Sequence, residues 1–395
     1  MLSMHPAAQA QRLTVLHSFM DGGDGTNARA GLMMDRAGNL FGTTAGYQSG
    51  TMSSAYELKA LGSGWVLNPL FDFAYPGSQY GFGLDSKLVV GPDGALYGVA
   101  AQGGYENCPN TNGSTYCGTV FKLQPSPSVC GSAICPWRST VLHYFDGAND
   151  GFTPSQMVFG SDGNIYGTTL FGGIEELCGQ GCGSVYKLVK SGREWTKTTL
   201  YSFHGDDGEY PVGGVIPDAL GNLYGVAFYG GQEGVGIVYK LSPVANGWTE
   251  TILYSFGRSG GYYPVGPLVF DASGNLYGIT QAGGPGDGGT VYELTRGMEW
   301  SELTLYNFPS NYFDGGPNGG LMFDSSGALY GTTFGGGANG LGTLFELMSS
   351  NGVWVYTDLH DFTSSDAPYP NGGLVSDESG NLYGTSEQTV WKLTR

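Results

Sequence analysis

Asp271-Ala-Ser-Gly-Asn-Leu-Tyr-Gly-Ile-Thr280 contains the phrase that decides the fold, because its core, Gly274-Asn-Leu-Tyr-Gly278, occurs in seven related copies. The other copies are Gly38-Asn-Leu-Phe-Gly42, Gly94-Ala-Leu-Tyr-Gly98, Gly163-Asn-Ile-Tyr-Gly167, Gly221-Asn-Leu-Tyr-Gly225, Gly327-Ala-Leu-Tyr-Gly331 and Gly380-Asn-Leu-Tyr-Gly384. The final glycines of successive copies are 56, 69, 58, 53, 53 and 53 residues apart. A period of this length, built from short β-type segments, is typical of the blades of a β-propeller.

Each copy lies within a unit in which we predict four β-strands. In the fifth unit they are Pro267 to Asp271, Asn275 to Thr280, Thr290 to Leu294, and Trp300 to Phe308. Turn-forming residues bound these segments, and none has the periodicity of an amphipathic helix. The Asp271-x-x-Gly274 link predicts a tight hairpin turn, in which glycine supplies positive φ and the aspartate accepts backbone hydrogen bonds. The aspartate recurs in most units, whereas Gly91 and Gly160 replace it in the second and third.

The two ends of the chain complement each other. Six units have a fourth strand marked by a Trp and a Phe eight residues apart, such as Trp248 and Phe256. The seventh unit stops after its third strand, Thr389 to Leu393, and a matching fourth strand occurs at the start of the chain, Leu13 to Phe19. Pairing these two segments closes the ring and covers sheet edges that an open array exposes. We therefore predict an all-β, seven-bladed propeller of four-stranded blades over residues 13–395, after a tail over residues 1–12.

Composition and charge restrict the class of partner. The chain has 71 glycines, 13% aromatic residues and a formal net charge of −18, with only 16 lysines and arginines. Binding to nucleic acid or to an anionic membrane surface needs clustered basic residues, so we expect neither. No apolar run is long enough for a transmembrane helix. Neutral glycans, cations and basic partners stay open, and we expect a monomer.

Six cysteines occur as three local pairs, which predicts the disulfides Cys108–Cys117, Cys130–Cys135 and Cys178–Cys182. The competing interpretation is a zinc site at Cys178 and Cys182, but no second pair of ligands lies nearby in the sequence. Disulfides indicate an oxidising compartment, so we predict a secreted or periplasmic protein. Ala8-Gln9-Ala10 in the tail resembles the end of an export signal.

The repeated Gly-Asn-Leu-Tyr-Gly-Thr-Thr, the Gly-Gly that follows it and the Gly-Thr-Val-Tyr-Lys/Glu-Leu strand resemble the GloVer-type tandem repeats of bacterial secreted and surface proteins. The resemblance covers nearly the whole chain. It implies an exported β-propeller, often tethered through a C-terminal anchor, whereas this sequence ends at Arg395 inside the last repeat. No activity common to the family follows from it, so it assigns no catalytic residues.

Functional residues are expected on one face of the propeller, where the loops from the fourth strand to the next unit meet the loops between the second and third strands. These loops combine aromatic rings with carboxylates and amides, which can stack on sugar faces and bond sugar hydroxyls. The insertions in the second and third units are predicted to wall a cleft. Substrate-binding candidates are Tyr105, Glu106, Tyr116, Glu175, Tyr210, Glu233, Arg258 and Tyr262, and catalytic candidates are Asp150, Glu176, His204 and Asp207.

A structural interpretation competes with the catalytic one. Asp24, Asp150, Asp207 and Asp366 fall at one position of the repeat, which is typical of turn residues. His17, His143 and His360 replace tyrosines of other units and are expected to be packing residues, as is the tyrosine of the Leu-Tyr-Gly phrase.

Two functions follow from these patterns. The first is a secreted polysaccharide-binding propeller that is also a candidate glycoside hydrolase or polysaccharide lyase; the second is a non-enzymatic adhesion or scaffold protein. An enzyme predicts two carboxylates, or a histidine and a carboxylate, that converge on one face. The sequence has no nucleophile elbow, zinc-protease motif or phosphate loop. Calcium is the one candidate cofactor, for the acidic loops, although no EF-hand pattern occurs.

Overall fold

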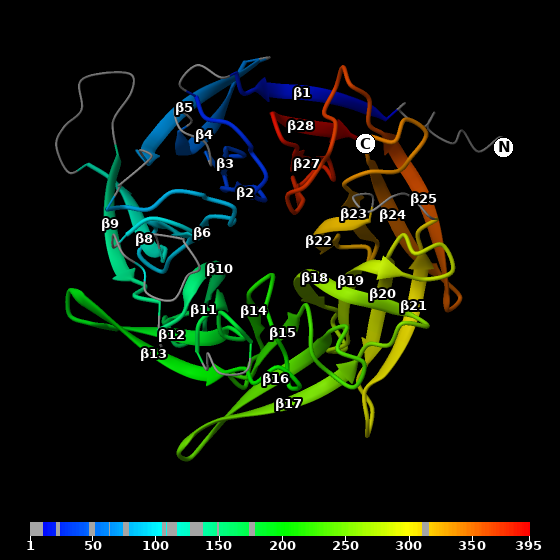
Figure 1. The fold of residues 1–395 in the computed structure, drawn as a ribbon. Coiled ribbons are helices and arrows are strands. Elements are labelled where there is room, and N and C mark those ends of the chain that lie inside the picture. Colours follow the sequence, from blue (N-terminus) through cyan, green and yellow to red (C-terminus); the bar gives the residue numbers. More distant parts are fainter. Residues whose placement is uncertain are drawn as a thin grey trace.

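The fold is a closed ring of seven sheets, obtained as a computed structural model of the chain (Figure 1). The structure describes residues 11–20, 24–46, 52–62, 64–73, 79–104, 108, 117–126, 137–147, 150–173, 178–309 and 316–395. These residues form 28 β-strands and no helix, arranged as seven antiparallel sheets of four strands. The prediction of an all-β, seven-bladed propeller is confirmed.

The first three blades follow one another in chain order. Blade 1 contains β2 (Met33–Met34), β3 (Leu40–Thr44), β4 (Ser53–Leu61) and β5 (Gly64–Phe73). Blade 2 contains β6 (Val89–Val90), β7 (Leu96–Ala100), β8 (Thr119–Pro125) and β9 (Trp137–Tyr144). Blade 3 contains β10 (Phe152–Phe159), β11 (Ile165–Phe171), β12 (Ser184–Ser191) and β13 (Glu194–Ser202).

The remaining blades repeat the same order, with the first strand nearest the centre of the ring (Figure 1). Blade 4 contains β14 (Val215–Pro217), β15 (Leu223–Ala227), β16 (Ile237–Val244) and β17 (Gly247–Ser255). Blade 5 contains β18 (Gly261–Phe270), β19 (Leu276–Gly283), β20 (Thr290–Thr295) and β21 (Ser301–Asn307). Blade 6 contains β22 (Pro317–Phe323), β23 (Leu329–Thr333), β24 (Thr343–Ser350) and β25 (Val353–Asp361).

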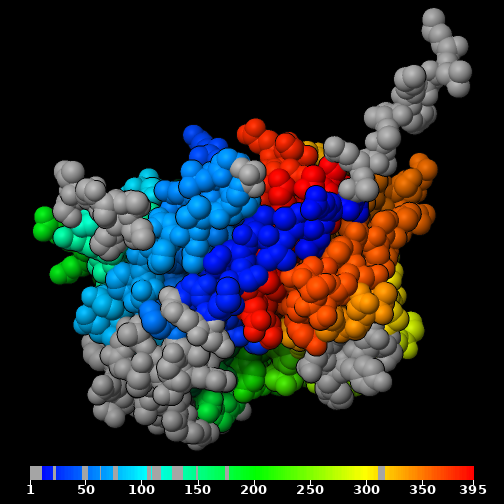
Figure 2. Space-filling view, turned by 90° about the horizontal axis from the view of Figure 1, so that it is seen from above, coloured from blue at the N-terminus to red at the C-terminus, as the bar shows by residue number. Residues whose placement is uncertain are grey.

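Blade 7 closes the ring with strands from both ends of the chain. It contains β26 (Val375–Ser376), β27 (Leu382–Thr385), β28 (Thr389–Thr394) and, as its outer strand, β1 (Arg12–Ser18). β1 pairs antiparallel with β28, with Leu13 opposite Leu393. Figure 2 shows the dark blue N-terminal strand across the side of the ring, with red atoms of the C-terminal strands next to it. The predicted closure is confirmed.

The glycine that ends each repeated phrase lets an aromatic ring of the third strand lie against the second strand. A Cβ atom added to Gly278 on β19 would lie 2.3 Å from the hydroxyl of Tyr292 on β20. The ring thus occupies the space that a side chain would need, and Tyr292 is fully buried. Seven hydrophobic clusters fill the spaces between the blades, and the fourth joins Tyr224 of blade 4 to Leu268 of blade 5.

The tyrosine of the repeated phrase packs between blades and also hydrogen-bonds to the hairpin aspartate. Tyr330 Oη donates to Asp324 Oδ2 at 3.0 Å. In blade 2, where Gly91 replaces the aspartate, Asp93 accepts the corresponding bond from Tyr97 at 3.0 Å. This tyrosine is therefore a packing residue, as predicted, and its hydroxyl also holds the hairpin turn through a hydrogen bond.

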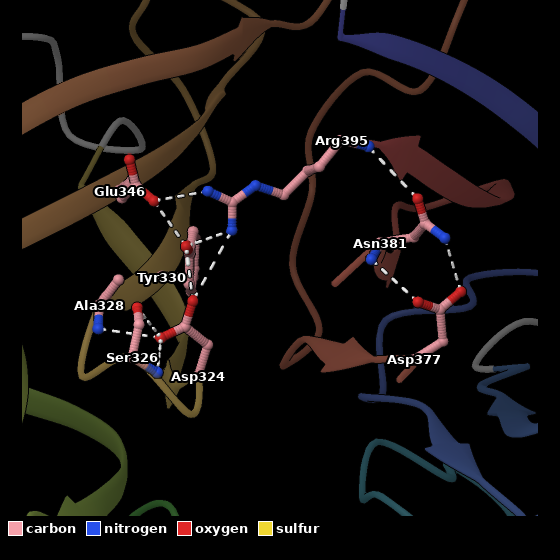
Figure 3. A network of polar contacts seen from close by, with 8 residues as sticks. All are labelled: Asp324, Ser326, Ala328, Tyr330, Glu346, Asp377, Asn381 and Arg395. Carbon is pink, nitrogen blue, oxygen red and sulfur yellow. Dashed lines mark hydrogen bonds and ion pairs between the residues drawn. The ribbon is translucent and has the colours of Figure 1, made fainter. Parts of the chain in front are cut away.

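Arg395 ties blade 7 to blade 6 on the face that carries these hairpin turns (Figure 3). Its guanidinium contacts the hydroxyl of Tyr330 and lies 2.8 Å from Glu346 Oε1, both in blade 6. Its backbone N–H donates to Asn381 Oδ1 at 3.2 Å, and the Asn381 amide donates to Asp377 Oδ2 at 2.7 Å within blade 7. We call this the lower face, and the opposite face, which carries the loops expected to be functional, the upper face.

Two of the three predicted disulfides are confirmed. Cys108 is bonded to Cys117, and Cys178 is bonded to Cys182. Cys130 and Cys135 lie outside the described residues. No described cysteine has a free thiol, so the zinc interpretation of Cys178 and Cys182 is wrong.

Candidate functional site

A continuous row of aromatic rings crosses the upper face of blades 3, 4 and 5. The rings of Phe171 and Tyr210 lie 5.0 Å apart, and those of Tyr210 and Tyr229 lie 5.7 Å apart. Tyr229 is 5.4 Å from Tyr263, which lies next to Tyr262 at 4.9 Å and stacks on Phe228 at 4.7 Å. All six rings are half-buried. We call this set, Phe171, Tyr210, Phe228, Tyr229, Tyr262 and Tyr263, the aromatic track.

Backbone geometry fixes two rings of the aromatic track. Tyr210 and Tyr263 have positive φ angles of 56° and 60°, and each precedes a proline. Bulky residues rarely adopt this conformation, and it costs about 1–3 kcal/mol. The Tyr210 N–H donates to Cys182 O at 3.0 Å, and the Tyr263 N–H donates to Val235 O at 2.8 Å. Both bonds reach into a loop between second and third strands, so the surrounding loops hold the strained tyrosines in place.

Next to Tyr210, the loop between β13 and β14 brings a histidine and a carboxylate together. The Asp207 carboxylate accepts the backbone N–H of His204 at 2.6 Å and is bonded to His204 Nδ1 at 3.0 Å. It also accepts the Tyr201 hydroxyl at 2.5 Å. The His204 side chain is 48% exposed, so the ring is in contact with solvent. The disulfide of Cys178 supports this loop, because its sulfur lies 3.6 Å from a Cβ position at Gly205.

A second carboxylate, Glu250 on β17 of blade 4, approaches the same group. Burial, and then the charge of Asp207, raises the pKa of Glu250 to about 7. Glu250 Oε1 is buried and has no hydrogen-bond partner among the described residues. The cluster of Tyr201, His204, Asp207 and Glu250 thus combines an acid that keeps its proton near neutral pH with a histidine oriented by a carboxylate.

The equivalent position in the preceding blade carries the opposite charge. Lys197 on β13 pairs with Leu188 as Glu250 pairs with Leu241, so the two side chains occupy one register. Lys197 Nζ lies 2.6 Å from Asp150 Oδ1, and His143 Nε2 lies 2.8 Å from Asp150 Oδ2. Burial opposes ionisation of Asp150, but the bond from His143 and the charge of Lys197 outweigh it and lower its pKa. Asp150 therefore lies in a compensated ion pair between blades 2 and 3, apart from the Glu250 cluster.

An open hollow lies beside the Glu250 cluster, at the outer end of blade 4. Its volume is about 730 Å³, and its lining includes Asp206, Gln232, Ile252, Tyr254 and Ser255. The Gly231 N–H donates to Asp206 O at 2.8 Å, which joins the loop that carries His204 to the loop that carries Tyr229. The hollow, the cluster and the aromatic track therefore share one pair of loops.

The other predicted binding residues of blades 4 and 5 lie on the same face but not at the cluster. Glu233 Oε2 accepts the backbone N–H of Arg258 at 2.9 Å. Tyr262 donates its hydroxyl to Asp287 Oδ1 at 2.7 Å. The predicted cleft residues Tyr105, Glu106, Tyr116, Glu175 and Glu176 lie outside the described residues.

The strand histidines and the recurring aspartates pair with one another. His17 Nε2 lies 3.1 Å from Asp24, and His360 Nε2 lies 2.9 Å from Asp366. Each of these histidine rings also packs against the phenylalanine two residues later, at 4.7 Å for His17. This arrangement agrees with the prediction of packing residues and turn aspartates.

Metal and membrane features are absent from the described residues. No group of three or more His, Cys, Asp or Glu side chains among them is arranged to hold a metal ion. No helix within the described ranges is long and apolar enough to span a membrane.

The prediction from sequence missed several members of this site. Glu250, Tyr201, Tyr229 and Tyr263 were not among the candidates. A signal for Glu250 exists, because it stands two residues after Trp248, as Lys197 stands two residues after Trp195.

Solved structures share the fold but little sequence. The extracellular domain of a B. thetaiotaomicron protein described as a one-component system is 11% identical, with a TM-score of 0.57; the match covers 98% of this chain and 40% of that one. An ulvan lyase of polysaccharide lyase family PL25, bound to a repeat of glucuronic acid and 3-sulfated rhamnose, is 10% identical, with a TM-score of 0.55; the match covers 96% and 95% of the two chains. At these identities the likeness concerns the propeller fold alone.

Comparison of sequences gives a more direct relationship. Among curated proteins, none is similar enough to count as a relative of the chain. A sequence model of the Gloeobacter/Verrucomicrobia repeat family matches residues 108–315, more than half of the chain, and the protein therefore belongs to that family.

Proposed function

We propose that the protein binds an extracellular polysaccharide along the aromatic track. The observation that carries this proposal is the unbroken row of six half-buried rings across three blades. Sugar rings have an apolar face that stacks on aromatic side chains and hydroxyls that bond to carboxylates and amides. Glu209, Gln232 and Asp287 border the track and supply such groups.

An extracellular location supports this choice of ligand. The two disulfides indicate an oxidising compartment. The net charge of −18 disfavours the binding of strongly acidic polymers, except where a basic residue of the protein lies near the binding site. One protein of the same fold is an ulvan lyase, which acts on a polysaccharide.

Cleavage of the bound chain is a second candidate function, favoured by the Glu250 cluster. In hydrolysis, Glu250 would give its proton to the glycosidic oxygen, and His204, oriented by Asp207, would take a proton from the attacking water. The two products each end in a hydroxyl, and transfer of the proton from His204 to Glu250 through solvent restores both groups. A pure scaffold would have no need of a partly buried, unpartnered carboxyl beside an oriented histidine.

Binding is tested by truncating one ring of the aromatic track. The change Tyr263→Ala removes the ring that contacts Phe228, Tyr229 and Tyr262, so we expect about tenfold weaker binding, equivalent to about 1.4 kcal/mol. The measurement is affinity electrophoresis in gels that contain laminarin, xylan, pectin, alginate or ulvan.

Tyr369→Ala is the matched control for this experiment. Tyr369 precedes Pro370, has the same φ of 60° and stacks on Phe334, but it belongs to blade 7. We expect it to bind like the wild type. Equal retention of both variants, or no retention of the wild type in any gel, contradicts the proposal and favours the adhesion or scaffold function.

A further inference from the structure

The centre of the upper face differs from blade to blade. Within the first strand or shortly before it, each blade has one equivalent residue near the inner edge of the sheet, and the bond from Asn318 Nδ2 to Asn371 Oδ1 at 2.9 Å joins these residues in blades 6 and 7. The equivalent residues of blades 1 to 5 are Arg29, Asp85, Ser155, Val212 and Val265. Among these seven equivalent residues, the charged ones are therefore Arg29 and Asp85, which belong to the adjacent blades 1 and 2. A site for one asymmetric ligand requires such a difference between repeats.

Blade 3 leaves a gap at this point because its entry segment is one residue shorter. Two residues separate Pro154 from Met157, whereas three separate Pro211 from Val215 at the same register. A pocket of about 240 Å³ lies between blades 2 and 3. Its polar lining includes Asp85, Gln102, Ser155 and Gln156, and its apolar lining includes Val99, Leu170 and Val212.

Two charged side chains of blade 2 have no hydrogen-bond or salt-bridge partner among the described residues, and one of them, Asp85, lines the pocket. Asp85 is open to solvent yet crowded by protein, and burial raises its pKa to about 6 against the opposing charge of Arg29. Lys87 is half-buried, and burial lowers its pKa. No hydrogen bond or salt bridge joins either group to another described residue. Lys87 stands where blades 1, 4, 6 and 7 have glycine, so packing of the ring does not require it.

From this geometry we infer a second binding site, separate from the aromatic track, for a single neutral sugar residue in the pocket between blades 2 and 3. Pockets for drug-sized ligands measure about 300–1,000 Å³, so a pocket of about 240 Å³ suits a smaller molecule. An unpaired carboxylate accepts bonds from sugar hydroxyls, and the amides of Gln102 and Gln156 supply donors and further acceptors. The apolar lining suits the C–H face of a sugar ring.

Other small ligands fit less well. A metal ion needs several oxygen ligands with compensating charge, and Asp85 is the one carboxylate in the lining. An anion would be repelled by Asp85 and by the net charge of −18.

The test is saturation-transfer NMR of the full chain with glucose, galactose, mannose, xylose, rhamnose and N-acetylglucosamine, each at millimolar concentration. We expect saturation transfer to at least one sugar. Asp85→Asn should bind that sugar at least tenfold more weakly. The control Glu378→Gln removes a carboxylate from an exposed turn of the lower face and should bind with wild-type affinity. Wild-type affinity should fall below about pH 6, as Asp85 gains a proton; the charged group that acts on Asp85 is Arg29, which contacts Glu387. The Asp85→Asn variant should lack this pH dependence.

The outcome is independent of the proposed function. Tyr263→Ala should bind the monosaccharide like the wild type, and Asp85→Asn should bind polysaccharide like the wild type. Transfer to none of the six sugars, sugar binding that survives in Asp85→Asn, or thermal stabilisation by calcium or putrescine in place of any sugar would overturn the inference. None of these results would affect the aromatic track.

Discussion

Lys197 and Glu250 occupy one register of adjacent blades, yet they create different environments. Lys197 neutralises Asp150, and the pair lies within 2.6 Å. Glu250 has no such partner, and burial, followed by the like charge of Asp207, raises its pKa to about 7. Because this position can hold either Lys or Glu, the blade does not need one particular residue there. The residue at this position can therefore be used for ligand binding or catalysis.

At this residue scale, Glu250→Gln tests the cleavage proposal. Glutamine keeps the shape of the side chain but cannot donate a proton as an acid, so we expect product formation to fall by roughly a hundred- to ten-thousand-fold. Wild-type activity should decline above about pH 7, because Glu250 loses its proton there. The measurement is release of reducing ends, with absorbance of unsaturated products to detect a lyase.

A positional role for Glu250 is separated from a catalytic one by two readouts. Glu250→Gln should keep polysaccharide retention, and below about pH 4.5 it should match the wild type in stability. Because the pKa of Glu250 is raised in the folded state, the wild type should lose stability as pH rises from its unfolded value of about 4.5 through about 7, and the variant should not. Unchanged product formation in the variant contradicts the proposal.

At the scale of the strand, close contact between β19 and β20 explains why one glycine recurs in every blade. Gly278 lies under the ring of Tyr292, and Gly225 and Gly42 lie under Tyr239 and Tyr56 in the same way. Any larger residue would push the third strand away from the second. The repeated glycine is thus a packing requirement of the sheet interior rather than a turn signal.

This contact predicts the effect of Gly278→Ala. The added methyl group would lie 2.3 Å from the Tyr292 hydroxyl, so we expect the free energy of unfolding to fall by about 1–3 kcal/mol. Combining it with Tyr292→Leu should cost less than the sum of the single changes, since the clash is relieved. Ser273→Ala, in the exposed turn before β19, should stay within about 0.5 kcal/mol of the wild type in urea titrations. A Gly278→Ala variant as stable as Ser273→Ala would disprove this account.

The strands and the closure could be predicted from sequence because the same strand pattern occurs in every repeat. The predicted strand Thr290 to Leu294 and the observed β20 (Thr290–Thr295) differ by one residue. Sequence also placed His204 and Asp207 in one loop, where they are bonded. Glu250 could not be placed beside them, because it lies in the next blade and the approach depends on the angle between two sheets. The pocket at Asp85 could not be predicted either. The entry segment of blade 3 is one residue shorter than in blade 4, and the sequence does not show that this leaves a cavity next to blade 2.

At the scale of the whole molecule, β1 and β28 join the ends of the chain in one sheet. Leu13 and Leu16 of β1 pack against the hydrophobic clusters on the two sides of blade 7. Without β1, the outer edge of β28 exposes unpaired backbone groups, which can pair with another molecule. The ring therefore depends on a contact between the most distant parts of the sequence.

Removal of residues 1–18 should make the protein self-associate. We expect the free energy of unfolding to fall by about 1.5–3 kcal/mol from the loss of the two half-buried leucines, and larger species in size-exclusion chromatography with light scattering. A chain that begins at Gln11 is the control and should keep the size of the full chain. A synthetic peptide of residues 11–20 should restore that size. If the shortened chain is as stable as the control and has the same size, β1 does not secure the ring.

The late arrival of Thr389–Thr394 affects how the protein is made. A ribosome delivers Arg12–Ser18 roughly 20 to 75 s before its neighbouring strand, at about 5–20 residues per second. During that interval β1 is an unpaired strand. It can pair with any exposed sheet edge, either in the incomplete propeller or in other nascent chains. Biogenesis of this protein thus favours either a chaperone that shields β1 or a delay in folding until β28 has been synthesised.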